Sequence, residues 1–287
     1  MKPFDHLVII YSWFIFVITI NQARPIENYM GVLAFHFSSI AFVLLLVYIG
    51  EKSNSRLITF FRLLYPVMLM AFYYETSGKL VHLIIPEFLD FQVVAFEKLV
   101  FGISPTIWLD NHLGVFWTEL FSASYFSYYL LIPGLSLIFF FHRKDEEIIR
   151  FMTALCATFF VSYMIFILYP IEGPRYYLAT QYQNSITSPI FRPMVDFVIK
   201  NGAFHGGAMP SSHCAVALIV MLFAIKNYSR KAWLLIPVIM GLSVGTVYGR
   251  FHYISDVVVG LLIGIICYGL VSIYYPIKTK TDNDYIS

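Results

Sequence analysis

Two short segments near the C-terminal end combine histidines with serines and an aspartate. Residues 206–213 read GGAMPSSH and residues 246–256 read TVYGRFHYISD, with His213, His252 and Asp256 among them. Each segment places a histidine at the start of an apolar run long enough to cross a bilayer. Polar and ionisable groups are costly at membrane depth and tend to be functional there. The two segments therefore predict a catalytic centre at one face of a membrane, rather than a pore or an anchor.

His252 and Asp256 are four residues apart, at the start of the last apolar run. On a helix this spacing puts both side chains on one face. A carboxylate bonded to one ring nitrogen fixes the histidine tautomer and leaves the other nitrogen as nucleophile or base. The alternative is a buried pair that only satisfies itself, because an unpaired aspartate in a span costs about 2.5–3.5 kcal/mol.

The first segment has the features of an anion site at a helix start. Pro210 suits the first helical turn, where its missing N–H costs nothing, and Ser211, Ser212 and His213 then occupy that turn. Free backbone N–H groups and the helix dipole favour a bound anion there. Such an anion would meet a hydroxyl and an imidazole. The alternative is a capped span with one interfacial histidine.

Two arginines could clamp a phosphate oxygen in a forked geometry. Arg175 follows an apolar run within residues 169–175 (YPIEGPR), and Arg250 stands two residues before His252. Arg192 is a weaker candidate, with contact to lipid headgroups as its alternative role. No zinc or iron–sulfur spacing occurs and the three cysteines lie inside apolar runs, so we expect neither a metal nor a cofactor.

The composition indicates a polytopic membrane protein. The chain has 287 residues, of which 59% are hydrophobic and 13% charged, whereas soluble domains have roughly 25% charged and 45–50% apolar residues. The apolar residues recur in runs that match about 30 Å of hydrocarbon. The net charge of +2 is too small to indicate a nucleic-acid partner. We therefore expect an all-α, polytopic membrane helix bundle.

The apolar runs predict eight spans. They cover residues 7–22, 31–50, 57–75, 117–141, 149–170, 211–226, 232–249 and 254–275. The first could instead be a cleaved signal peptide, although its bulky aromatic residues and the lack of a small-x-small site argue against cleavage. Residues 86–109 and 189–200 have apolar residues at helical spacing and predict two helices in the membrane interface, with an ordered loop as the alternative.

Lysine and arginine set the expected orientation. Eleven of the nineteen lie in the tails and in the short connections 51–56, 142–150 and 226–231, whereas the much longer remaining connections hold seven. The positive-inside rule then puts both tails in the cytoplasm. It puts residues 171–210 and 250–253 on the outer face, so both histidine segments reach the same side of the membrane.

Taken together, these segments resemble the type 2 phosphatidic acid phosphatase superfamily, whose three motifs are K-x6-R-P, P-S-G-H and S-R-x5-H-x3-D. Residues 210–213 resemble the second motif with Ser212 in place of glycine, residues 252–256 resemble the end of the third, and Arg175 resembles the arginine of the first. The resemblance implies a six-span core plus about two N-terminal spans. Its parts would be an N-terminal transmembrane extension (1–56), a phosphatase-like catalytic membrane domain (57–275) and a cytoplasmic tail (276–287).

The resemblance also implies roles. His252 would attack phosphorus and form a phosphohistidine, Asp256 would orient it, and His213 would protonate the leaving alcohol. The phosphate-binding set would be Arg175, Ser211, Ser212 and Arg250, with neighbouring backbone N–H groups. Phosphoryl transfer depends mainly on such positioning and charge stabilisation.

Three positions depart from the motifs. The lysine of the first motif is Leu168 and its proline is Tyr176, while the arginine of the third motif is Thr246. The clamp has thus lost two cations, one of which Arg250 could replace by approaching from the next turn. A weaker clamp favours a phosphodiester over a phosphomonoester. These losses resemble the inositol phosphorylceramide synthase branch, which moves a phospho-headgroup between lipids.

We therefore expect an integral-membrane lipid phosphatase or phosphotransferase that cleaves a phospholipid phosphoester and passes the phosphoryl group to water or a lipid alcohol. One alternative is an inositol phosphorylceramide synthase-like headgroup transferase without phosphatase activity. A second is a non-catalytic membrane transport or lipid-binding protein. We expect a bacterial cytoplasmic membrane as the location, with the site on the periplasmic or extracellular side.

Overall fold

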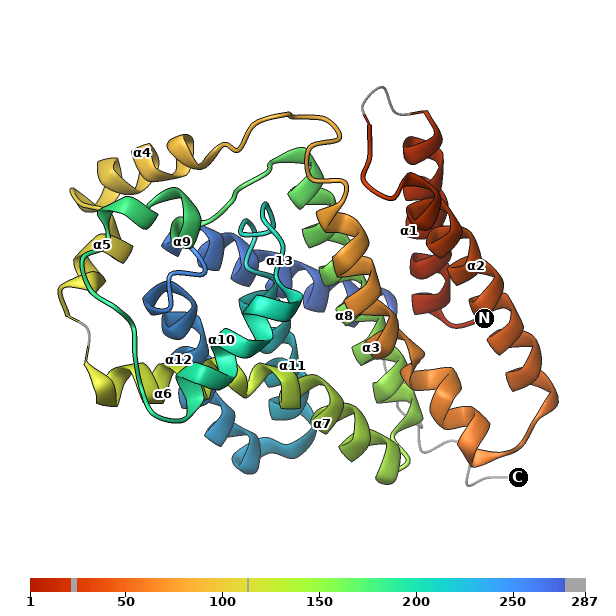
Figure 1. Cartoon of the computed structure of the whole chain (residues 1–287). Coiled ribbons are helices and arrows are strands. Elements are labelled where there is room, and N and C mark those ends of the chain that lie inside the picture. Colours follow the sequence, from red (N-terminus) through yellow and green to blue (C-terminus); the bar gives the residue numbers. More distant parts are fainter. Residues whose placement is uncertain (22–24, 113, 277–287) are drawn as a thin grey trace.

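The computed structural model describes residues 1–21, 25–112 and 114–276, and in these residues the regular structure is helical (Figure 1). The longer helices are α1 (Pro3–Ile20), α2 (Tyr29–Lys52), α3 (Arg56–Gly78), α4 (Asp90–Phe101), α6 (Val115–Phe126), α7 (Tyr128–Phe141), α8 (Asp145–Leu168), α10 (Phe191–Gly202), α11 (Ser212–Tyr228), α12 (Leu235–Tyr248) and α13 (Ile254–Tyr274). The short helices are α5 (Pro105–Asp110), α9 (Pro174–Tyr177), η1 (Ala179–Gln181) and η2 (Ser229–Leu234). The expected all-α fold is confirmed.

Within the described residues, seven helical segments are long and apolar enough to cross a membrane. One of them, Val115–Phe141, combines α6 and α7, and another adds part of η2 to α12. The remaining span expected from the sequence, 211–226, corresponds to α11, which is apolar but shorter than the others. The helices expected at 86–109 and 189–200 are also present, as α4 with α5 and as α10.

Helix α8 is the centre of the bundle. Of the candidate spans it is the most buried, and it packs against α1, α3, α11 and α13. Its first turn contains Asp145, Glu146 and Glu147, which favour helix initiation because negative charge complements the N-terminal dipole. The span that follows is buried almost all round, as is typical of a core helix.

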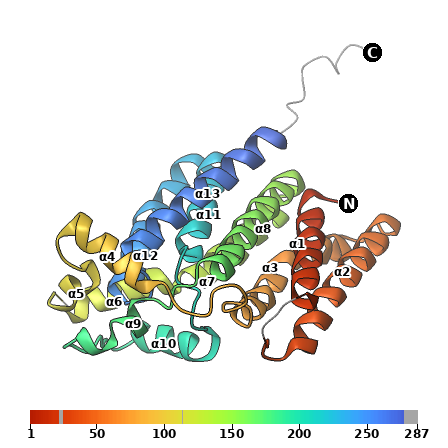
Figure 2. The same cartoon turned by 90° about the horizontal axis from the view of Figure 1, so that it is seen from above.

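Helices α1 and α2 lie at one side of the bundle, against α3 and α8 (Figures 1 and 2). A buried ion pair joins α1 to α3: the Asp5 carboxylate accepts hydrogen bonds from the Arg62 guanidinium and, at 2.8 Å, from the Tyr65 hydroxyl. The side chain of Asp5 is fully buried. This pair anchors the N-terminal hairpin to the rest of the protein.

The lysine- and arginine-rich connections meet at one end of the bundle. Arg56 pairs with Asp145 at 2.8 Å, and the Lys144 ammonium donates to Asn227 at 3.0 Å. The opposite end carries α4, α5, α9 and α10 (Figure 2). Arg24, Lys278 and Lys280, which contributed to the expected orientation, lie outside the described residues.

Two glycines allow α11 and α13 to approach closely at that opposite end. A Cβ atom on Gly264 would lie 2.7 Å from the carbonyl oxygen of Ala215, and one on Gly260 would overlap the backbone of Ser211. Small residues at such positions let helix backbones pack together in membranes. The contact places the first turns of α11 and α13 side by side, and these turns carry the two histidine segments.

Candidate active site

The structure brings His213 and His252 together. Their ring centroids are 5.8 Å apart, and both side chains line a small cavity of about 70 Å³ together with Arg175 and Ser212. His213 lies in the first turn of α11, and His252 lies two residues before α13 begins, so that it precedes the N-cap residue Tyr253. The cavity therefore collects residues from three segments that are far apart in the sequence.

A backbone carbonyl determines which nitrogen of His252 is available. Nδ1 lies 2.7 Å from the oxygen of Ala208, a distance that requires Nδ1 to carry the proton and donate it. Nε2 then has a free lone pair, as a nucleophile requires. His252 is buried, so its ring is held in one orientation.

Asp256 lies close to His252, but the shortest polar contact of the His252 ring is the one with Ala208. Oδ2 lies 3.5 Å from Nδ1 of His252, longer than a normal hydrogen bond, and accepts a hydrogen bond from the backbone N–H of Tyr253 at 2.8 Å. Asp256 is fully buried. Its carboxylate thus closes the first turn of α13 and faces the protonated nitrogen of His252.

Ser211 and Ser212 have different structural roles. Helix α11 begins at Ser212, so the expectation that Pro210 and Ser211 belong to its first turn is wrong. Pro210 precedes the helix and Ser211 is its N-cap. The hydroxyl of Ser211 accepts from the N–H of Cys214 at 3.4 Å, and its own N–H donates to the carbonyl of Asp256 at 2.9 Å. Ser212, rather than Ser211, lines the cavity.

His213 has a partner that sequence spacing did not indicate. Its Nε2 lies 3.2 Å from the hydroxyl of Tyr125 on α6, and its ring also packs against that of Tyr128. These tyrosines orient the imidazole at the edge of the cavity. In the sequence they are two of many aromatic residues inside a span, so no local signal distinguishes them.

Arg175 reaches the cavity because two loops pair with each other. The N–H of Ala208 donates to the carbonyl of Ile171 at 3.1 Å, next to an isolated bridge between Ile171 and Gly207. This pairing holds α9, which carries Arg175, beside the start of α11. Within the described part of the chain, the buried Nη1 of Arg175 has no hydrogen-bond partner, so it is free to bind an anion.

Arg250 is not brought to this cavity. Its guanidinium forms an ion pair with Asp110, donates to the carbonyl of Asn184 at 2.6 Å and lies 3.9 Å from the ring centre of Tyr182. Burial lowers the pKa of Arg250 and the Asp110 carboxylate opposes that change. The geometry therefore does not support Arg250 as a replacement for the missing cations, because its donors hold the 182–184 segment.

Glu172 also lies at the cavity, where we did not expect it, and it pairs with His205. Glu172 lines the cavity and accepts from Nδ1 of His205 at 2.8 Å. The His205 ring stacks on Tyr176, with centroids 3.8 Å apart. The cavity thus contains one arginine and one carboxylate, which makes it less positive than a clamp built for a dianion.

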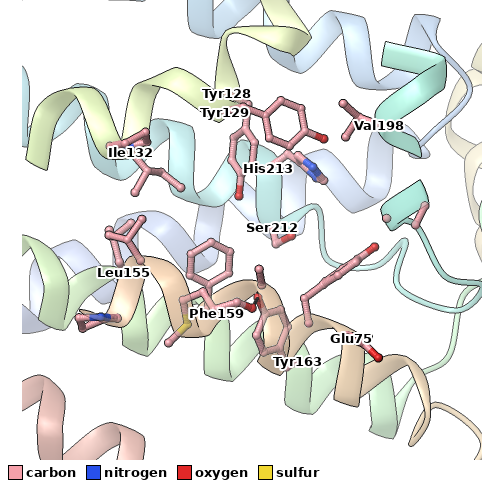
Figure 3. Close-up of a pocket in the computed structure, with 18 of the residues that line it drawn as sticks. Glu75, Tyr128, Tyr129, Ile132, Leu155, Phe159, Tyr163, Val198, Ser212 and His213 are labelled. Carbon is pink, nitrogen blue, oxygen red and sulfur yellow. Dashed lines mark hydrogen bonds between the residues drawn. The ribbon is translucent and has the colours of Figure 1, made fainter. Parts of the chain in front are cut away.

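A larger apolar cavity of about 530 Å³ adjoins the small one (Figure 3). Six residues line both cavities: Tyr74, Tyr125, Ile199, Ala203, Ser212 and His213. The larger cavity extends between α3, α7 and α8, and Figure 3 shows Ile132 and Leu155 in the part remote from Ser212. If the apolar chain of a lipid occupied this cavity, the polar group of that lipid would lie at His213.

The helical bundle defines an integral membrane protein, and comparison with known proteins identifies its family. The sequence model of the PAP2 superfamily matches residues 93–270, more than half of the chain, so the chain belongs to this superfamily. A PA-phosphatase related-family protein of Dictyostelium discoideum is 24% identical over 192 residues, which cover 60% of this chain and 35% of that relative. The chain thus spans about a third of that protein's length. No solved structure matches.

Proposed function

We propose that this protein cleaves a phosphoester of a membrane lipid through a phosphohistidine on His252. The observation that carries the proposal is the hydrogen bond from His252 to the Ala208 carbonyl, because it leaves Nε2 unprotonated towards a cavity that also holds Arg175 and His213. Membership of the PAP2 superfamily supports phosphatase-like chemistry.

The reaction has two balanced steps. Nε2 of His252 attacks phosphorus, the bond to the lipid alcohol breaks, and His213 gives its proton to the departing oxygen. Water or a lipid alcohol then attacks the phosphohistidine, His213 takes back a proton, and His252 is released. Arg175, Ser212 and the first N–H groups of α11 hold the phosphoryl oxygens in both steps.

The proposed site faces the outer side of the membrane. The connections rich in lysine and arginine lie at the other end of the bundle, where Arg56, Lys144 and Lys226 meet Asp145, Asn227 and Glu147. The positive-inside rule assigns that end to the cytoplasm. The catalytic domain of 57–275 and the extension of 1–56 remain the proposed division of the chain.

A second function, transfer of a phospho-headgroup to a lipid alcohol, is favoured by two observations. The cavity presents one arginine beside Glu172, which suits a monoanionic phosphodiester better than a dianion. The apolar cavity of about 530 Å³ next to His213 could hold the chain of an acceptor alcohol.

Phosphorus NMR on purified protein in mixed lipid micelles tests both functions. The micelles contain phosphatidic acid, a headgroup phospholipid and a lipid alcohol. We expect either a growing inorganic phosphate peak, which indicates a phosphatase, or a new lipid diester without free phosphate, which indicates a transferase. Either peak must be absent with His252→Ala and present with His142→Ala, an exposed histidine at the opposite end. Turnover by a folded His252→Ala protein would exclude the mechanism.

A further inference from the structure

Asp90, the first residue of α4, is a fully buried carboxylate that does not line either cavity. Its Oδ2 accepts the backbone N–H of Glu172 at 2.7 Å, and its Oδ1 accepts the N–H of Gly173 and the hydroxyl of Tyr253, both at 2.9 Å. One side chain therefore bonds to the loop that precedes Arg175 and to the residue that follows His252.

Other contacts of α4 hold the same two segments. The N–H of Leu89 donates to the carbonyl of Pro170 at 2.9 Å. Two turns along the helix, Oε1 of the buried Glu97 accepts the N–H of Ser255 at 2.8 Å and its hydroxyl at 3.1 Å. Asp90 and Glu97 are seven residues apart and share the inner face of α4. This face thus contacts both the loop before α9 and the first turn of α13.

Burial and hydrogen bonding act on Asp90 in opposite directions. Burial raises the pKa of its carboxyl group, whereas the two backbone N–H donors and the Tyr253 hydroxyl lower it. A buried carboxylate costs free energy unless its oxygens have donors. Each donor here comes from a segment beside the cavity, so displacing either segment leaves the carboxylate unsatisfied. The contact therefore resists movement of the two loops relative to each other.

The backbone N–H of Gly173, which Asp90 accepts, belongs to a residue with an unusual backbone conformation. Its φ is +100°, a conformation that side chains rarely adopt, and a Cβ atom there would lie 3.1 Å from Ala208 and 3.2 Å from the carbonyl of Phe251. The chain turns at this glycine into α9 and hence to Arg175. Rotation of the Gly173 peptide would redirect the Arg175 side chain.

We propose that Asp90 is a positioning residue that sets the placement of Arg175 relative to His252. It acts through the Gly173 amide on one side and through Tyr253 on the other, without touching the substrate. The inference rests on the proposed function for its turnover readout only. Asp90 lies outside the range matched by the family model, which begins at residue 93.

Asp90→Asn tests the proposal because it keeps the volume of the side chain. Whichever way the amide turns, its NH2 group faces a donor, either the N–H of Glu172 or that of Gly173. We expect faster hydrogen–deuterium exchange in peptides covering 171–178, with α8 unchanged, and a kcat/KM lower by about tenfold to hundredfold, as a small misplacement of reacting groups produces. Glu87→Gln, an exposed acid three residues earlier, is the control and should match wild type.

Tyr253→Phe removes only the hydroxyl that reaches Asp90 and decides the question if Asp90→Asn does not fold. We expect it to lower kcat by about tenfold. In the double variant the losses should not add, because both changes disrupt the hydrogen-bond network around the same Asp90 side chain. Wild-type exchange in 171–178 and wild-type kcat in either folded variant would overturn the proposal. An inactive wild-type protein would overturn the proposed function alone, because the exchange comparison does not use turnover.

Discussion

Gly260 of α13 packs directly against the backbone carbonyl of Ser211, the N-cap residue of α11. The contact leaves no room for a side chain, and it brings the start of the helix that follows His252 against the start of the helix that carries His213. The relative position of the two histidines thus depends on a glycine about two turns into the last span.

Gly260→Ala should therefore separate the two helix starts. The added methyl group overlaps Ser211, and we expect turnover to fall by about tenfold or more, as overpacking shifts backbone. Gly269→Ala on the same helix is the control, because a Cβ atom there has no neighbour within 4 Å. Equal turnover of the two variants, measured on folded protein, would show that the close packing is not needed for the site.

Arg175 and Arg250 should respond differently to substitution. Arg175→Ala removes the cation of the cavity and should lower kcat by about 100-fold to 1,000-fold, as loss of a transition-state donor does. Arg175→Lys should recover only part of this, because an ammonium lacks the forked geometry. The readout is steady-state turnover of the lipid substrate.

For Arg250→Ala we expect mainly a loss of stability, because Asp110 would keep a buried charge without its partner. Turnover per folded molecule should fall less than for Arg175→Ala. Thermal unfolding and turnover measured on the same samples separate the two effects. A stable Arg250→Ala protein as inactive as Arg175→Ala would return Arg250 to the phosphate-binding set.

Asp256→Asn should be milder than His252→Ala. The Ala208 carbonyl, at 2.7 Å, already fixes the tautomer of His252, while Asp256 lies 3.5 Å away. We expect kcat to fall by about tenfold to hundredfold, because the change removes the carboxylate charge beside His252 and weakens the hydrogen bond from the Tyr253 N–H that holds the first turn of α13. If Asp256→Asn is as inactive as His252→Ala, the aspartate rather than the carbonyl controls the nucleophile.

Ile132→Trp should reduce the space for a lipid chain. Ile132 lines the apolar cavity away from His213, and a larger side chain there fills the part that a long chain would occupy (Figure 3). We expect weaker turnover of long-chain lipids than of a short-chain phosphoester in the same preparation. Leu137→Trp on the exposed side of α7 is the control. Equal losses for both chain lengths would argue against a chain in this cavity.

The first helix should remain in the mature protein. Removing it would leave Arg62 buried without Asp5, its ion-pair partner. Asp5→Ala leaves the same unpaired charge, and we expect it to destabilise the protein by about 3–5 kcal/mol. Intact-mass measurement detects cleavage, and unfolding of Asp5→Ala against Glu27→Gln, an exposed acid, tests the pair. Loss of the first twenty-odd residues from active protein would contradict this prediction.

The sequence by itself determined the helical elements and indicated the candidate site residues. Apolar runs and proline or glycine positions are local signals, so the membrane helices and both additional helices could be located. The four-residue spacing of His252 and Asp256 also indicated that the two side chains lie close together, but His252 precedes α13 and does not lie on a helix face with Asp256. The charge pattern also indicated which ends of the helices lie together. The lysine and arginine content of each short connection can be read from the sequence alone, without knowing how the helices pack.

Only the tertiary structure decided the partners. Asp90 meets Tyr253, Arg250 meets Asp110 and Tyr125 meets His213 across long stretches of sequence. No periodicity encodes these contacts, because they depend on how loops pack once the helices have assembled. For the same reason the sequence could propose Arg250 as a phosphate ligand, and the fold could direct its guanidinium to a carboxylate instead.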